Sequence, residues 1–215
     1  MLASGASSGP LRLVFASRIE PHKGIDLVLD AAALVQNRGG IDFQIDVFGA
    51  GRVSQFMQQA YVQNLETIVQ YRGMLPKSEM LKRYQDYDAL LFPTEEREPF
   101  GCVAAEAAAG GCIPILTADI GAAEWMVDGL DCVKIRRDPM DLAAAIVDLA
   151  RQEPAQRAAF RERVKRNARI TFDFERWFGK MTALLEVAAA GHSLVSTLPE
   201  KGALSLGLLA HIWRL

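Results

Sequence analysis

Short apolar runs alternate in this chain with longer segments whose apolar residues recur every three or four positions. The short runs predict buried strands, and the periodic segments predict helices with one apolar face. The predicted strands are Leu11–Ala16, Phe43–Phe48, Thr67–Tyr71, Asp88–Phe92, Ile113–Leu116 and Cys132–Ile135. The helices predicted to follow them are Ile25–Gln36, Val53–Leu65, Ser78–Asp86 with Ser78 as its cap, Phe100–Gly110, a helical turn at Ala122–Val127, and Met140–Arg151.

This order of elements predicts an α/β fold with a doubly wound, Rossmann-like parallel sheet and right-handed crossovers. Ligands of such folds bind beyond the carboxyl ends of the strands, so the loops that leave those ends are candidates for the site. Two further helices are predicted at Pro154–Ile170 and Phe174–Ala189. We assign residues 11–190 to the domain, residues 1–10 to a linker or an added chain end, and residues 191–215 to an apolar tail whose role stays open.

The composition bounds the class of protein. The chain has 215 residues, half of them apolar, which is enough for one ordinary hydrophobic core. Its net charge is −2 and its pI is near 6.0, so no chain-wide basic field favours nucleic acid, and we expect no nucleic-acid partner. A bound anion must instead be held by a local cluster of cations.

The cysteines indicate the compartment. Cys102, Cys112 and Cys132 are odd in number and lack the Cys-x-x-Cys spacing, which disfavours both a disulfide framework and a zinc site. The first ten residues also lack the charged and long apolar regions of a secretory signal. We therefore expect a reducing, cytoplasmic setting.

The loop after the first predicted strand carries Arg18 and Lys23, followed by Gly24 at a helix start. A planar guanidinium and a compact ammonium suit phosphate oxygens, and a glycine lets an anion approach the backbone closely. The alternative is a pair of solvated loop cations, and spacing alone does not separate the two interpretations. After the second strand, Gly49-Ala50-Gly51 is too short for a dinucleotide fingerprint and indicates a tight turn near the ligand.

A second charged stretch surrounds a helix made almost entirely of small residues, Phe100–Gly110. Glu98 precedes this helix and Glu106 lies within it. The start of the helix offers free N–H groups and the positive end of its dipole to an anion. If Glu98 were helical too, the two carboxylates would lie about 12 Å apart along the axis. That separation is wider than the roughly 5 to 10 Å of a glycosidase acid/base pair, and it suits the two polar ends of one long ligand.

These motifs together resemble a known family. Arg18-x4-Lys23-Gly24, followed by Glu98-Pro-Phe-Gly-x4-Glu106-Ala, is similar to the C-terminal, donor-binding domain of a retaining GT-B glycosyltransferase of the family 4 (group 1) type. Gly121-Ala122-Ala123-Glu124 also matches the family's Gly-Gly-x-x-Glu turn, except that Ala122 replaces the second glycine. The similarity covers about residues 11 to 188.

The resemblance implies roles for the four charged residues. Arg18 and Lys23 would hold the nucleotide diphosphate and neutralise the leaving group. Glu98 would face the donor sugar, which makes Arg18, Lys23 and Glu98 the implied catalytic set. Glu106 would accept hydrogen bonds from the ribose hydroxyls.

The resemblance also implies donor contacts through the backbone. Gly24 would allow the diphosphate to come close to the start of its helix. The amides of Phe100 and Gly101 would lie near the sugar hydroxyls or the distal phosphate. Met74 and Leu75, in the loop after the third strand, would lie against the base through their main chain.

The family implies a whole enzyme that is larger than this chain. Its donor is a UDP- or GDP-linked sugar, from which a hexosyl unit is transferred with retention to a glycan or lipid-linked acceptor. It requires no metal and no cofactor. Its acceptor site belongs to a second, N-terminal doubly wound domain, so we expect slow transfer, or none, by this chain alone.

Two alternative functions remain open from the sequence. A single domain is compatible with a non-catalytic nucleotide-sugar-binding or regulatory module, and, less favourably, with a GT-B sugar-nucleotide epimerase. The basic residues Arg161, Arg163 and Lys165–Arg169 predict a solvated helix face. The alternative for this face is peripheral contact with the anionic inner side of a membrane or with a lipid-linked acceptor.

Overall fold

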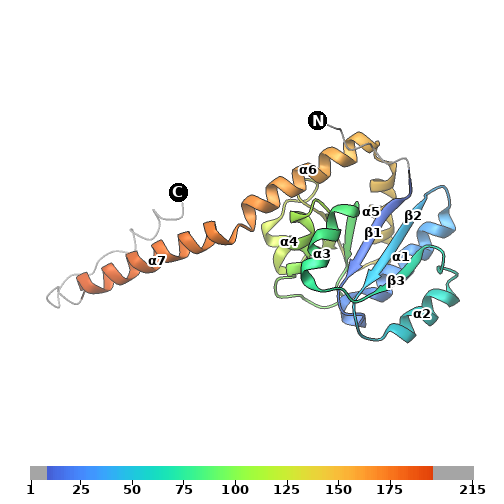
Figure 1. Cartoon of the computed structure of the whole chain (residues 1–215), viewed down its shortest axis with the longest axis horizontal. Coiled ribbons are helices and arrows are strands. Elements are labelled where there is room, and N and C mark those ends of the chain that lie inside the picture. The colour runs from blue at the N-terminus through green and yellow to red at the C-terminus, as the bar shows by residue number, and fades with distance from the viewer. Residues whose placement is uncertain (1–8, 196–215) are drawn as a thin grey trace. The chain divides into compact units, whose positions relative to one another are not determined.

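The computed structural model describes residues 9–195 and contains one parallel sheet of six strands (Figure 1). The strands are β1 (Leu11–Ala16), β2 (Phe43–Phe48), β3 (Val69–Gly73), β4 (Ala89–Phe92), β5 (Ile113–Thr117) and β6 (Val133–Ile135). Their order is β3-β2-β1-β4-β5-β6. The chain therefore moves outward from β1 to β3, returns to the middle at β4, and moves outward again on the other side.

This strand order places a topological switch point between β1 and β4. Leu13 of β1 pairs in register with Ile45 of β2 on one side and with Ala89 of β4 on the other. The predicted doubly wound fold is confirmed, and its switch point is where such folds bind ligands.

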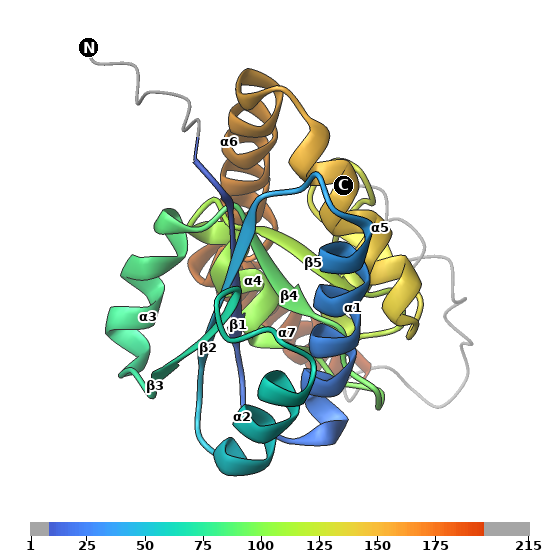
Figure 2. The same ribbon diagram turned by 90° about the vertical axis from the view of Figure 1, so that its right-hand side faces the viewer.

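Helices cover both faces of the sheet (Figure 2). They are α1 (Ile25–Arg38), α2 (Val53–Val62), α3 (Lys77–Arg83), α4 (Cys102–Ala109), α5 (Pro139–Arg151) and α6 (Pro154–Thr171). The same part of the chain also contains 3-10 turns η1 (Pro21–Lys23), η2 (Tyr84–Asp86) and η3 (Gly121–Trp125), and a further helix, α7 (Phe174–Val195), follows later in the chain. Helix α1 packs on α2 and α5, and α4 packs on α6. Strands β4 and β5, which lie between these layers, are buried at every residue, as continuous apolar runs predict.

Several element boundaries differ from the sequence prediction, among them those of α3, β3 and α4. Helix α3 begins at Lys77 with Pro76 at its N-cap, so Ser78 lies inside the helix and is not its cap. Strand β3 begins at Val69, because the amides of Ile68 and Val69 both donate to the carbonyl of Leu65 and hold the preceding residues in a turn. Helix α4 is shorter than predicted at both ends and begins after Gly101.

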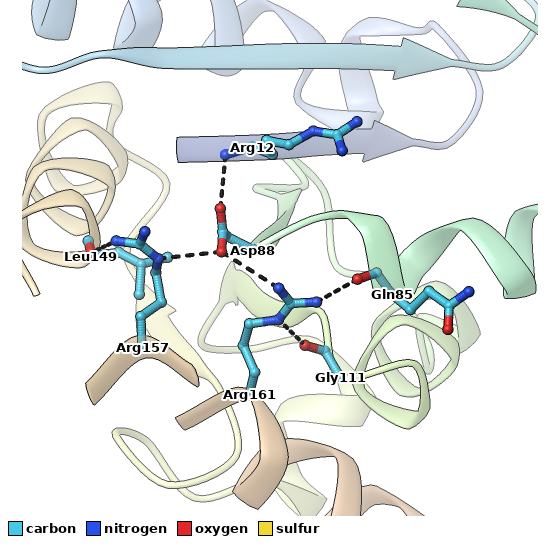
Figure 3. Close-up of polar contacts among 7 residues, drawn as sticks. All are labelled: Arg12, Gln85, Asp88, Gly111, Leu149, Arg157 and Arg161. Carbon is cyan, nitrogen blue, oxygen red and sulfur yellow. Dashed lines mark hydrogen bonds and ion pairs between the residues drawn. The ribbon is translucent and has the colours of Figure 1, made fainter. Parts of the chain in front are cut away.

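Helix α6 is joined to the sheet through Asp88, just before β4 (Figure 3). One carboxylate oxygen accepts from the backbone N–H of Arg12 at 2.9 Å, and the other accepts from Arg157 Nε at 3.2 Å and lies 3.6 Å from Arg161 NH1. Arg161 Nε also donates to the carbonyl of Gly111 at 2.9 Å. Two arginines of one helix are thus anchored on one aspartate at the amino edge of the sheet.

These contacts correct the prediction of a uniformly solvated basic face. Arg163 donates to the carbonyls of Gly129 and Leu130, and the Asn167 amide donates to Asp131 at 2.6 Å. With Arg161, these side chains attach α6 to neighbouring loops. The sequence could not predict these hydrogen bonds. An arginine that donates to carbonyls far along the chain occurs at the same helical positions as an arginine whose side chain is solvated.

The chain divides after Phe172 into two compact units. In the second unit the described part is α7, whose first turn is capped by the Asp173 side chain accepting from the Arg176 amide at 3.1 Å. No helix within residues 9–195 is both long and apolar enough to cross a membrane. Most of the predicted apolar tail, from residue 196 onward, lies outside the described residues.

Candidate functional site

The loops after β1 and β2 lie against each other through their backbones. The Ile19 amide donates to the Ala50 carbonyl at 2.8 Å. A Cβ atom on Gly49 would lie 1.9 Å from the Ser17 carbonyl oxygen, and one on Gly51 would lie 2.4 Å from that of Ile19. The Gly-Ala-Gly turn is therefore required for this close approach, which is the tight turn that the sequence predicts.

The loop after β1 also contacts the loop after β4. Gly24 has φ +78° at the start of α1, and a Cβ atom there would lie 1.8 Å from the Pro93 carbonyl oxygen. The Glu95 amide donates to the His22 carbonyl at 3.1 Å. The two loops on either side of the switch point are thereby held side by side.

These loops bring Lys23 and Glu98 into an ion pair. Their side chains are 14% and 22% exposed, so the pair is partly shielded from water. Arg18 lies on the same loop as Lys23, is exposed, and has its guanidinium 3.4 Å from His22 Nε2. The three residues implied as catalytic thus occupy two adjoining loops at the carboxyl edge of the sheet.

The segment that carries Glu98 is fixed by the turn that η3 forms. The Gly121 amide donates to the Glu98 carbonyl at 3.1 Å, and the Ala122 amide donates to that of Phe100 at 2.7 Å. A Cβ atom on Gly121 would lie 2.0 Å from the Pro99 carbonyl oxygen, so this position requires glycine. Ala122 is buried in an ordinary 3-10 conformation, and alanine in place of glycine therefore preserves the turn.

Helix α4 starts directly after this segment. Its cap residue, Gly101, has φ 83°, and a Cβ atom there would lie 2.8 Å from the Phe92 ring and 3.4 Å from Glu98 Cγ. The first N–H groups of α4 lack intrahelical partners and can donate to an anion. The Phe100 ring makes an edge-to-face contact with Phe172 at 6.1 Å, which packs the loop onto the end of α6.

A pocket of about 290 Å³ opens beside this loop, between the ends of β1 and β2, the loop after β3, and helices α3 and α4. It is lined by Arg18, Gly49, Met74, Leu75 and Glu106, among others. The pocket therefore collects four residues predicted to bind the nucleotide. Lys23, Glu98 and the start of α4 form the second part of the site at the switch point.

One further charged residue lines the pocket. Lys77, the first residue of α3, has its Nζ 2.6 Å from Glu106 Oε1. The Glu106 side chain is 22% exposed and that of Lys77 is 72% exposed. Burial and then the charge of Glu106 raise the pKa of the Tyr84 phenol in the same pocket.

The sequence model of the family "Glycosyl transferases group 1" matches residues 3–170. This chain belongs to the group 1 glycosyl transferases. The family resemblance inferred from Arg18, Lys23, Glu98 and Glu106 is therefore confirmed. The chain's two predicted acidic positions and two predicted basic positions all lie in or beside the carboxyl edge of the sheet.

Two curated relatives of this chain are considerably longer proteins. The chain is 32% identical over 187 residues to a glycogen synthase of Mycobacterium tuberculosis, a match that covers 85% of this chain and 43% of that protein. It is 32% identical over 197 residues to a D-inositol 3-phosphate glycosyltransferase of Geodermatophilus obscurus, covering 86% of this chain and 42% of that protein. The chain thus spans less than half the length of either relative.

Solved structures establish the same fold. Anabaena HepE, in complex with UDP and glucose, matches with a TM-score of 0.71 and 21% identity over 84% of this chain and 49% of that one. The C-terminal domain of a group 1 family glycosyl transferase from Francisella tularensis matches with a TM-score of 0.63 and 20% identity over 76% of this chain and 84% of that domain. The group 1 chain described here therefore has the architecture of one GT-B domain.

The group 1 motifs identified the charged residues but not Lys77. Their spacing places Arg18 in the loop after β1 and Glu106 within α4, whereas the pairing of Lys77 with Glu106 depends on how α3 packs beside α4. The available signal was a lysine directly after Met74-Leu75-Pro76, at the start of a helix that faces the expected base. Such a lysine is indistinguishable by sequence from a solvated one.

One cysteine offers a chemical probe of the site. Cys102 is exposed at the start of α4, whereas Cys112 and Cys132 are buried. Burial raises the pKa of the Cys132 thiol to about 12 and raises that of Cys112 further. We expect one thiol to react rapidly with a disulfide reagent in the native chain and all three after unfolding. The Cys102→Ser variant should lose the rapid reaction; two rapid thiols in the native chain would contradict the burial described here.

Proposed function

We propose that this chain binds the nucleotide-diphosphate sugar donor of a retaining glycosyltransferase that transfers a hexosyl unit. The observation that carries the proposal is the pocket with Arg18 and Glu106 next to the Lys23–Glu98 pair at the switch point. HepE, which shares the fold, has been solved with UDP and with UDP-glucose. A UDP- or GDP-linked sugar is therefore the proposed donor.

The nucleoside end of the donor is assigned to the pocket. Met74 and Leu75 line it from the loop after β3 and would lie against the base. Glu106 would accept hydrogen bonds from the ribose hydroxyls. A carboxylate offers two oxygens with several lone-pair positions, which suits a vicinal diol.

The diphosphate and sugar are assigned to the switch point. Arg18 and Lys23 would contact the phosphate oxygens, with the N–H groups at the start of α4 completing the anion site. When the bond from the anomeric carbon to the diphosphate breaks, its electron pair leaves with the diphosphate, and these cations would stabilise the added charge. Glu98 would then exchange its ion pair with Lys23 for contact with the sugar hydroxyls.

These cations supply the charge that a metal supplies in other phosphate sites, and we propose that neither metal nor cofactor is needed.

The acceptor, a glycan or a lipid-linked sugar, is assigned to a second doubly wound domain outside this chain, in keeping with the greater length of the relatives. Three free cysteines support a cytoplasmic setting. One alternative is a non-catalytic nucleotide-sugar-binding module.

Calorimetric titration tests the donor site directly. We expect saturable binding of UDP or GDP that is unchanged by EDTA. Lys23→Met and Glu106→Gln should each weaken it by about 1 to 3 kcal/mol, since each removes hydrogen bonds that involve a charged group. Lys82→Met and Glu96→Gln, at exposed positions on α3 and in the loop before Glu98, should leave the affinity unchanged.

Two results would contradict the proposal. Binding of neither nucleotide would remove its basis, and so would equal affinities for wild type, Lys23→Met and Glu106→Gln. The alternative module is tested by supplying an acceptor-domain chain. Donor binding without any transfer in that mixture would favour the module over the enzyme.

A further inference from the structure

The ion pair between Lys77 and Glu106 joins two helices that line the pocket. Lys77 begins α3, and Glu106 lies in the second turn of α4. Both residues line the pocket, and their charged atoms are 2.6 Å apart. The hydrogen bond to Glu106 raises the pKa of Lys77, which further favours the charged form of the lysine.

Among the described residues, Lys77 is the one ion-pair partner of Glu106. The residues of α4 that lie one turn from Glu106 on the same side of the helix are Cys102, Val103 and Ala109, and none of them carries a cation that could hold the carboxylate. Lys77 binds Oε1 and leaves Oε2 and further lone pairs for hydroxyl donors. An anchored carboxylate loses less conformational entropy when a ligand binds than a freely rotating one.

We propose that Lys77 is a positioning residue of the donor site, which holds the Glu106 carboxylate toward the ribose and thereby sets the preference for a ligand with a cis-diol. The inference rests on the proposed function, because it assigns the ribose to Glu106. It adds to the site a residue outside the charged motifs, and it predicts discrimination between nucleotides with and without the ribose cis-diol. Lys77 acts through Glu106 and does not itself contact the reacting atoms.

If Lys77 instead served mainly to stabilise the fold, its replacement would lower the free energy of unfolding. An ion pair whose lysine is largely exposed contributes little to stability, so Lys77→Met should leave the urea unfolding curve unchanged. Its effect should appear in ligand binding, and only for ligands that carry the ribose hydroxyls. Methionine keeps most of the apolar stem of lysine, which leaves the pocket wall in place.

The test compares UDP with 2′,3′-dideoxy-UDP, or the GDP pair if the chain binds GDP. In wild type the natural nucleotide should bind more tightly. Lys77→Met should weaken UDP binding about fivefold and should leave the dideoxy analogue within about twofold. Lys77→Arg should restore the preference, and Lys82→Met on the same helix should not alter it. In a Glu106→Gln background, Lys77→Met should have no further effect.

Several results would overturn this inference. Tighter UDP binding by Lys77→Met would make the lysine a competitor for Glu106, and an equal loss for both nucleotides would assign it a general attraction for phosphate. Unchanged UDP binding would make it a solvated residue. In each of these cases wild type still binds nucleotide, so the proposed function stands; if wild type binds neither UDP nor GDP, both proposals fail together.

Discussion

Replacing Asp88 by alanine is expected to lower the free energy of unfolding by about 3 kcal/mol, because removing one partner of a buried ion pair leaves the other charge uncompensated. Arg157 is only 8% exposed, and its guanidinium reaches Asp88 and the Leu149 carbonyl. The carboxylate also holds Arg161 and the backbone N–H of Arg12. Equilibrium urea unfolding followed by circular dichroism measures the loss.

Two further variants identify the cause of this loss. Asp86→Ala, at an exposed position two residues earlier, should change stability by less than about 0.5 kcal/mol. Adding Arg157→Met to Asp88→Ala should recover part of the stability, because the buried charge is then gone. If Asp88→Ala costs no more than Asp86→Ala, the network in Figure 3 is not what joins α6 to the sheet.

The central strands could be predicted from the sequence because a parallel sheet covered on both faces needs continuous apolar runs. The predicted bounds of β1, Leu11–Ala16, and of β2, Phe43–Phe48, agree with the structure. The edge strand β3 was displaced because its residues Gln70 and Arg72 are polar, so hydrophobicity does not mark its ends. The sequence pattern therefore predicts strand ends most accurately for inner strands, which pair with a strand on each side and are covered by helices on both faces.

The candidate site was predictable where it depends on motifs, and it was not where it depends on packing. Lys23 and Glu98 meet because the fold brings the loops after β1 and β4 to the switch point, which strand order alone implies. Lys77 meets Glu106 only through the position of α3 beside α4. Likewise, Arg157 is 69 residues from Asp88 in the sequence, and no local pattern relates them.

Gly24→Ala should have the other large effect, on stability and on nucleotide binding together. Its φ of +78° costs a residue with a Cβ atom about 1 to 2 kcal/mol. The added atom would also lie 1.8 Å from the Pro93 carbonyl oxygen, and relieving such an overlap costs about 1 to 3 kcal/mol more. Separation of the two loops would draw Lys23 away from Glu98, so UDP or GDP should bind more weakly.

Gly129→Ala is a control that separates the cost of a positive φ from the cost of the steric overlap with Pro93. Gly129 has φ +73°, and a Cβ atom there would have nothing within 4 Å among the described residues. We expect it to cost only the conformational part, about 1 to 2 kcal/mol, and to leave nucleotide affinity unchanged. Urea unfolding and calorimetric titration of both variants give the comparison. If the two substitutions prove equal in both measurements, the contact between Gly24 and Pro93 does not hold the loops together, and another interaction must position Lys23 opposite Glu98.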